Sequence, residues 1–311
     1  MKSRGVADLL PLTDVDTSKP KSIDEICELA VKLPCSPAVL PKLMAALCDN
    51  NNTAAEVERV IKLDSALAGA TLRLANSAYF GGEQHIETVS DAVITLGQKE
   101  LYRLASITLL NRWEEAHAKS LPWEPGDYSR HSICTAIAAE VLAEHHGREN
   151  PEVAYTSGLV CDIGKLVLAY FCSSFYPAIS ERAMCTGCTW EKAEEAVIGF
   201  NHSDVGSLLL SIWNFPEELS EAVRFQFNPD RADPPIKPML ALLHAARYVA
   251  VCLGPGVTEG GFLFQLHGDF LAEHGYTNEL IEMAMIEVKD RFTKRMGGKA
   301  TGFQSAAGTA R

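Results

Sequence analysis

The sequence has no uninterrupted apolar run near the roughly 20 residues that a membrane-spanning helix requires. It also has no surplus of basic residues, because 28 Lys and Arg stand against 40 Asp and Glu, for a formal net charge of −12. Binding to phosphate backbones or anionic lipid depends on such a surplus, so we expect neither a nucleic-acid nor a membrane partner. The first residues lack the apolar segment of a signal peptide, and a cytoplasmic location is therefore expected.

A second pair of closely spaced cysteines is also missing. The chain has nine cysteines, and Cys185 and Cys188 form the one close pair. A structural zinc site would need a second pair or nearby histidines at suitable spacing. We therefore expect these cysteines to be small packing residues of a reduced protein, with a redox or metal role for Cys185 and Cys188 as the alternative.

Strand-like alternation is almost absent, and no segment of 20 to 50 residues repeats. From about residue 22 onward, apolar residues recur at spacings of three and four, which predicts amphipathic helices. Among them we expect continuous helices over residues 129–146, 152–171 and 189–212, and a helix end at Gly97. The fold class is therefore predicted to be all-α.

A Pro/Gly-marked joint at residues 121–128, LPWEPGDY, divides the predicted helices into two lobes. The expected organisation is a loose N-terminal segment, a first helical lobe, a second helical lobe and a flexible tail, over residues 1–21, 22–123, 124–295 and 296–311.

One apolar helical run, SGLVCDIGKLVL over residues 157–168, carries two adjacent polar residues, Cys161 and Asp162. An unpaired carboxylate in a core costs several kcal/mol, and it normally shifts its pKa or pairs with a cation. Asp162 therefore needs a partner from elsewhere in the chain, and the nature of that partner separates an enzyme from a non-enzyme.

The segments LPCSPAVLPKLMAAL, IKLDSALAGATLRLANSAYFGG and VSDAVITLGQKELYRLA resemble the HDOD family, the "HD-related output domain" of bacterial signalling proteins. GLVCDIGKLVL and NHSDVGSLLLSIWNFPEEL are similar to the degenerate HD-phosphohydrolase half of that family. The resemblance covers roughly residues 22–255 and implies that the second lobe has an HD-domain helical core.

Active HD proteins bind divalent metal through a histidine, a His-Asp pair and a distant aspartate, and they hydrolyse phosphate esters. The resemblance places His131 at the first histidine and Cys161-Asp162 at the pair, so that cysteine replaces a ligand. It places Arg247 at the distant aspartate, and Gln226-Phe227 where many relatives have two histidines. His202 persists.

A guanidinium at the metal position removes a ligand and repels a cation. We therefore predict that Arg247 pairs with Asp162, that His131 lies close by, and that this vestigial HD site holds neither metal nor cofactor. Two alternatives stay open: a residual zinc site formed by His131, Cys161, Asp162 and His202, and a pocket for a nucleotide or another small ligand.

The stretch RLANSAYFGG supplies a second candidate site, a docking surface formed by Asn76, Tyr79 and Phe80. Its alternative is a structural elbow between two helices. Residues 89–110 also have helix-turn-helix spacing, but Glu100 accompanies Lys99 and Arg103 and most other positions are apolar, which favours core packing over DNA binding.

The expected function is that of a non-catalytic HDOD signalling or output module that acts through a protein partner, without an attached receiver or nucleotide-cyclase segment. The alternatives are a metal-dependent phosphohydrolase with altered ligands and a nucleotide-sensing module. The identity of the partner, the input signal and the oligomeric state do not follow from the sequence.

Overall fold

The computed structural model describes residues 22–32, 58–59, 61–62, 65–76, 85–117, 122–256 and 264–296. Within these ranges every regular element is helical, which confirms the predicted all-α class. The α-helices are α1 (Ile23–Val31), α4 (Ser65–Ala75), α5 (Val89–His117), α6 (Asp127–His146), α7 (Pro151–Val160), α8 (Ile163–Phe171), α9 (Tyr176–Thr186), α10 (Trp190–Ile198), α11 (His202–Ile212), α12 (Glu217–Arg224), α13 (Lys237–Leu253), α14 (Gly268–Glu273) and α15 (Asn278–Arg295).

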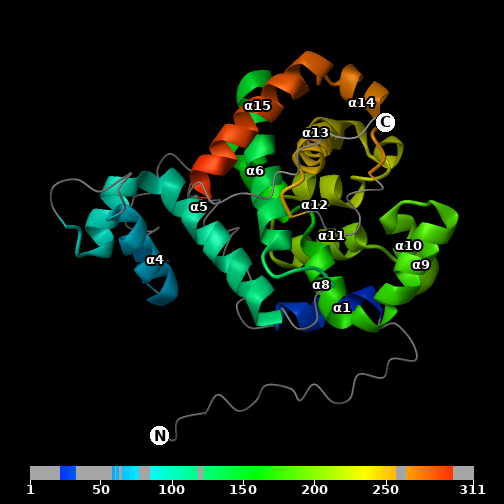
Figure 1. The fold of residues 1–311 in the computed structure, drawn as a ribbon, viewed down its shortest axis with the longest axis horizontal. Coiled ribbons are helices and arrows are strands. Elements are labelled where there is room, and N and C mark those ends of the chain that lie inside the picture. Colours follow the sequence, from blue (N-terminus) through cyan, green and yellow to red (C-terminus); the bar gives the residue numbers. More distant parts are fainter. Residues whose placement is uncertain are drawn as a thin grey trace, which may run out of the picture.

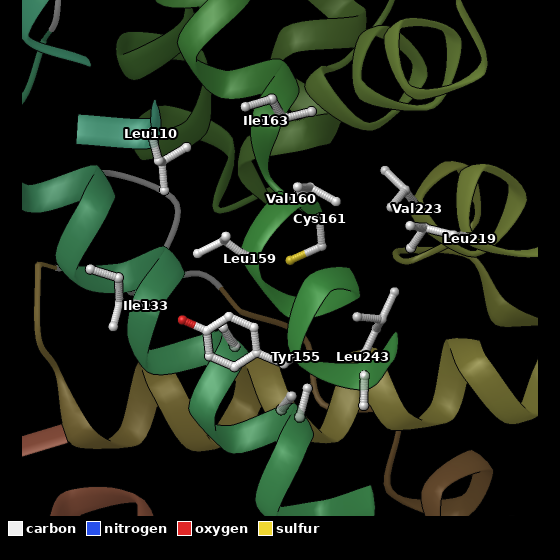
Figure 2. Packing of buried hydrophobic residues seen from close by; sticks show 14 of the residues in the cluster. Leu110, Ile133, Tyr155, Leu159, Val160, Cys161, Ile163, Leu219, Val223 and Leu243 are labelled. Atoms are coloured by element: carbon white, nitrogen blue, oxygen red, sulfur yellow. The ribbon is translucent and has the colours of Figure 1, made fainter. Parts of the chain in front are cut away.

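Helix α6 lies at the centre of the larger group of helices and packs against α7, α13 and α15 (Figure 1). It is buried along most of its length, and its small residues Ala136, Ala138 and Ala139 let neighbouring helices approach closely. Gly158 of α7 sits directly against this helix, because a Cβ there would lie 2.7 Å from the Thr135 carbonyl oxygen. Side chains of α7, α12 and α13 fill the adjoining core (Figure 2).

Two of the helices predicted as continuous are interrupted. Residues 152–171 form α7 and α8, with a break at Cys161 and Asp162. Residues 189–212 form α10 and α11, because Gly199 takes a left-handed φ of 90° and the Asn201 side chain caps the next helix. The predicted break at Gly97 is confirmed, since its φ of 74° and ψ of 162° interrupt α5.

Helix α1 packs against α8 and α11, and its Cys27 thiol donates to the Val205 carbonyl over 3.7 Å. It was expected in the first lobe, yet it contacts helices of the second. Helices α4 and α5 pack on each other and extend to one side, and α5 also contacts α6 (Figure 1). Contacts between helices therefore cross the joint at residues 121–128.

Among the described residues, two stretches, Pro151–Phe171 and Pro234–Leu253, are long and apolar enough to cross a membrane by length and composition. In the apolar 18-residue window of each stretch, 89% and 61% of the window, respectively, is buried inside the fold. Packing against other helices therefore accounts for their apolar character.

Candidate functional site

The break between α7 and α8 presents Asp162 to the interior. Asp162 precedes the first turn of α8 with φ −102° and ψ 15°, and its carboxylate makes no capping bond to that helix. Close packing fixes the position of the break, because a Cβ on Gly164 would overlap the His202 carbonyl oxygen of α11. The carboxylate is thus left available to side chains from other helices.

Two cations hold this carboxylate. Arg247 Nη2 of α13 lies 3.3 Å from Asp162 Oδ1, and Lys165 Nζ of α8 lies 3.2 Å from Oδ2. All three residues are buried, with exposed fractions of 4%, 2% and 6% for Arg247, Asp162 and Lys165. Burial by itself would raise the pKa of Asp162, but the charges of Arg247 and Lys165 outweigh it and hold that pKa far below its usual range. The predicted ion pair with Arg247 is present.

Aromatic rings position the Arg247 guanidinium. Its central carbon lies 4.5 Å from the centre of the Phe227 ring and 5.5 Å from that of Phe264. The neighbouring Gln226 donates from Nε2 to the Cys161 carbonyl over 3.2 Å. Gln226 therefore stabilises the break at Cys161, and Phe227 stabilises the position of Arg247.

His131 and His202 both face Asp162. His131 Nε2 lies 3.7 Å from Oδ2, and His202 Nε2 lies 3.9 Å from Oδ1. Burial lowers the pKa of His131 to about 4, so this imidazole is neutral at pH 7. His202 is held from its other side by Glu194, whose carboxylate is 2.6 Å from Nδ1 and accepts the His202 backbone N–H over 2.9 Å.

The thiol of Cys161 does not act as a ligand toward this centre. It donates to the Gly158 carbonyl over 3.3 Å, back along α7. Burial, and then the adjacent Asp162 charge, raise its pKa to about 12, so it remains a neutral thiol at physiological pH. A zinc ligand would have to be the thiolate.

The donors present do not fit the divalent metal that the HD resemblance implies. Asp162 is already engaged by two cations, and Arg247 places a fixed positive charge beside it. Among the described residues, no group of three or more His, Cys, Asp or Glu side chains is arranged to hold a metal ion. The arrangement is a buried polar cluster whose carboxylate is neutralised by side chains.

The structure thus brings together His131, Cys161, Asp162, His202, Gln226 and Arg247, all of them sequence-predicted site residues. Sequence reasoning missed the roles of Lys165 and Glu194. Lys165 stands three residues after Asp162 on the same helical face, which is a signal that the sequence contained. Glu194 had no such signal, because its contact with His202 depends on the turn between α10 and α11.

Of the predicted docking surface, the structure describes Asn76; Tyr79 and Phe80 lie outside the described residues. The Asn76 amide is used within the chain. Its Nδ2 donates to the carbonyls of Leu72 and Ile86, and its Oδ1 accepts the Ile86 backbone N–H. These bonds favour the elbow alternative for Asn76 over a contact with a partner.

Comparisons with known proteins agree with this architecture. The family model of the HDOD domain matches residues 33–229, more than half of the chain. A curated relative, an uncharacterized protein of Treponema pallidum (strain Nichols), is 21% identical over 234 residues, which cover 73% of this chain and 44% of that protein. The chain therefore spans less than half the length of that relative.

Three solved structures are similar in fold. An HDOD domain protein of unknown function from Geobacter sulfurreducens has a TM-score of 0.68 at 20% identity, over 88% of this chain and 99% of that one. A candidate signal transduction protein from Marinobacter aquaeolei VT8 has a TM-score of 0.68 at 22% identity, and the match covers 89% of this chain and 64% of that one. A candidate phosphohydrolase from Shewanella amazonensis SB2B has a TM-score of 0.61 at 24% identity, and the match covers 88% of this chain and 94% of that one. At these identities the likeness establishes the fold and leaves the activity open.

Proposed function

Because the chain belongs to the HDOD domain family, and because Arg247 stands beside Asp162 where the HD pattern has a metal ligand, we propose that it is a non-catalytic signalling module. It passes on a signal by binding another protein, in the cytoplasm of a bacterial cell. The single observation that carries the proposal is the engagement of Asp162 by Arg247 and Lys165.

This observation bears on catalysis through the activation of water. In HD-type hydrolysis the metal lowers the pKa of a bound water and neutralises the charge on the phosphate. A guanidinium also neutralises a phosphate, but it has no open coordination position and cannot activate water in this way. The residues around Asp162 therefore support binding and structure rather than hydrolysis.

The test is elemental analysis of protein purified without chelator, combined with turnover assays on phosphate esters and cyclic dinucleotides. Each assay is run with manganese, magnesium, iron and zinc. We expect substoichiometric metal and no turnover above that of Asp162→Ala. The variant Cys161→His/Arg247→Asp restores the donors that the HD pattern implies at these two positions. It tests whether the two positions account for the expected lack of metal and turnover.

Near-stoichiometric metal, with turnover that Asp162→Ala abolishes, would overturn the proposal in favour of a phosphohydrolase with altered ligands. Metal without turnover would instead indicate a structural zinc site that includes Cys161. Both results concern this cluster alone, so partner binding needs a separate experiment.

Partner binding is tested by affinity capture from the source organism with the wild-type chain and with Tyr79→Ala and Phe80→Ala. If these two residues form a docking surface, the captured partner is lost while the thermal unfolding midpoint stays unchanged. A lower unfolding midpoint with full capture would assign both rings to the elbow.

A further inference from the structure

A cavity separate from the Asp162 cluster lies where α4 and α5 meet α6, α7 and α15. Its volume of about 680 Å³ falls within the range of roughly 300 to 1,000 Å³ that small-molecule sites occupy. Most of its wall is apolar, and four aliphatic side chains contribute: Leu74, Leu104, Ile107 and Ile137. Such a wall suits the apolar body of a small ligand.

The charged residues at this cavity are unlike the rest of the chain. Four cations line it against two carboxylates, whereas the whole chain has a net charge of −12. The cations are Arg103, Arg291, Lys294 and Arg295, and the carboxylates are Glu100 and Glu140. The lining residues themselves therefore carry an excess of two positive charges, before the acidic residues just outside the cavity are counted.

Each of the four cations pairs with at least one carboxylate. Arg291 also contacts Glu144 and Glu287, and Lys294 contacts Asp290, which lie outside the cavity lining. Arg103 and Arg295 share the carboxylate of Glu100, at 2.9 and 3.0 Å. Arg103 also pairs with Glu140, which in turn accepts Lys99 over 3.0 Å.

Two polar atoms in the lining have neither a hydrogen-bond partner nor an ion-pair partner among the described residues. One is the hydroxyl of Tyr155, a fully buried residue, and the other is Nε of Arg103. The Arg103 guanidinium carbon lies 5.3 Å from the centre of the Tyr155 ring, so both groups belong to one corner of the cavity. Buried donors without partners are rare and need a water or a ligand to satisfy them.

We propose that this cavity binds a small molecule with an apolar body and one anionic group, which Arg295, Arg103 and the Tyr155 hydroxyl receive. The anion is a carboxylate, sulfonate or phosphate, whose oxygens match guanidinium donors. The ligand contacts helices α5 and α15 together, so it stabilises the arrangement in which these helices are close. Because Tyr155 belongs to α7, which ends at the Asp162 break, the site offers an input to the proposed signalling module.

The experiment uses two dyes with the same ring system and different charge. The probe is 8-anilino-1-naphthalenesulfonate, and N-phenyl-1-naphthylamine is its uncharged counterpart. Both are titrated into the full chain while dye fluorescence is recorded. We expect the sulfonate dye to bind saturably at one molecule per chain, and more tightly than the uncharged dye.

Variants then separate the anionic contact from the apolar one. Arg295→Gln should weaken the sulfonate dye roughly tenfold or more, the effect of losing a charge-assisted hydrogen bond, and leave the uncharged dye unchanged. Arg224→Gln on α12 is the matched control, because that arginine is half exposed, pairs with Glu221 and does not line the cavity; it should change neither dye. Leu104→Trp should fill the cavity and exclude both dyes.

Circular dichroism and thermal unfolding of each variant show whether it is folded, and Ile107→Trp replaces Leu104→Trp if the latter is not. Equal binding of the sulfonate dye to wild type and Arg295→Gln would overturn the proposal, as would full binding to a folded, filled variant. The cavity and the Asp162 cluster are tested on different residues, so the failure of one proposal leaves the other standing.

Discussion

Replacing Asp162 with asparagine should destabilise the protein strongly, because the substitution leaves two buried cations without their carboxylate. Arg247 and Lys165 both lie within 3.3 Å of that carboxylate and are 4% and 6% exposed. Removing one partner of such a buried pair costs about 3 to 5 kcal/mol. Urea unfolding followed by circular dichroism measures the loss.

Removing the cation instead, in Arg247→Met, should lower the free energy of unfolding by less, about 1 to 3 kcal/mol. Lys165 still neutralises Asp162 in this variant, and the change removes Arg247 Nε and Nη1, which have no hydrogen-bond partner among the described residues. The two positions are coupled, so the double variant should lose about 0.5 to 3 kcal/mol less than the sum of the single losses.

The pH dependence gives an independent check. The folded pKa of Asp162 is depressed, so its stabilising contribution is present above the unfolded value of about 3.9 and is lost as the pH falls toward the folded value. Below about pH 4, the stability of the wild type should therefore fall more steeply with falling pH than the stability of Asp162→Asn.

Asp290→Asn is the matched control for these measurements, because Asp290 and its partner Lys294 are 59% and 75% exposed, and an exposed pair contributes little. If Asp162→Asn cost less than about 1 kcal/mol, or if the double variant were strictly additive, the carboxylate would be solvated by water rather than paired with Arg247.

Three further results are expected. Burial lowers the pKa of His131 to about 4, so this residue should lower the stability by up to roughly 3 kcal/mol as the pH falls from 6.5 to 4, and a urea-denaturation series over that range should be less steep for His131→Gln than for the wild type. A Cβ at Gly164 would overlap the His202 carbonyl, so Gly164→Ala should lower the thermal midpoint markedly, whereas Gly268→Ala, with open space around it, should not; equal midpoints would contradict the close packing of α8 on α11. In the native protein a thiol reagent should modify the exposed Cys185 at once and spare the buried Cys161 until unfolding, as mapped by peptide mass spectrometry; early labelling of Cys161 would mean that it is a reactive thiolate.

The features that the sequence predicted well are those with a local or family-wide signature. Apolar spacing of three and four identified the helical class, and Gly97 interrupts its helix because a left-handed φ favours glycine. The pairing of Asp162 with Arg247 was predictable because the HD pattern fixes which positions converge, although 85 residues separate the two.

What the sequence did not reveal depends on three-dimensional packing. Periodicity passes through Cys161 and Asp162 without interruption, yet the helix breaks there, and the Cys161 carbonyl accepts a bond from Gln226, a residue 65 positions away. Likewise, the cavity lined by Arg103, Tyr155 and Arg295 is assembled from helices that are far apart in sequence. No window of the sequence contains these contacts.

Side chains supply the positive charge that Asp162 needs in the core. Arg247 and Lys165 are positive, Asp162 and the Glu194 that holds His202 are negative, and His131 is neutral because its pKa is lowered to about 4. A divalent cation placed here would add two positive charges in a region of low dielectric constant, beside a guanidinium that cannot lose its proton. Where the HD resemblance implies an acidic ligand, Arg247 supplies positive charge beside Asp162, and this charge makes the site unfavourable for a divalent metal.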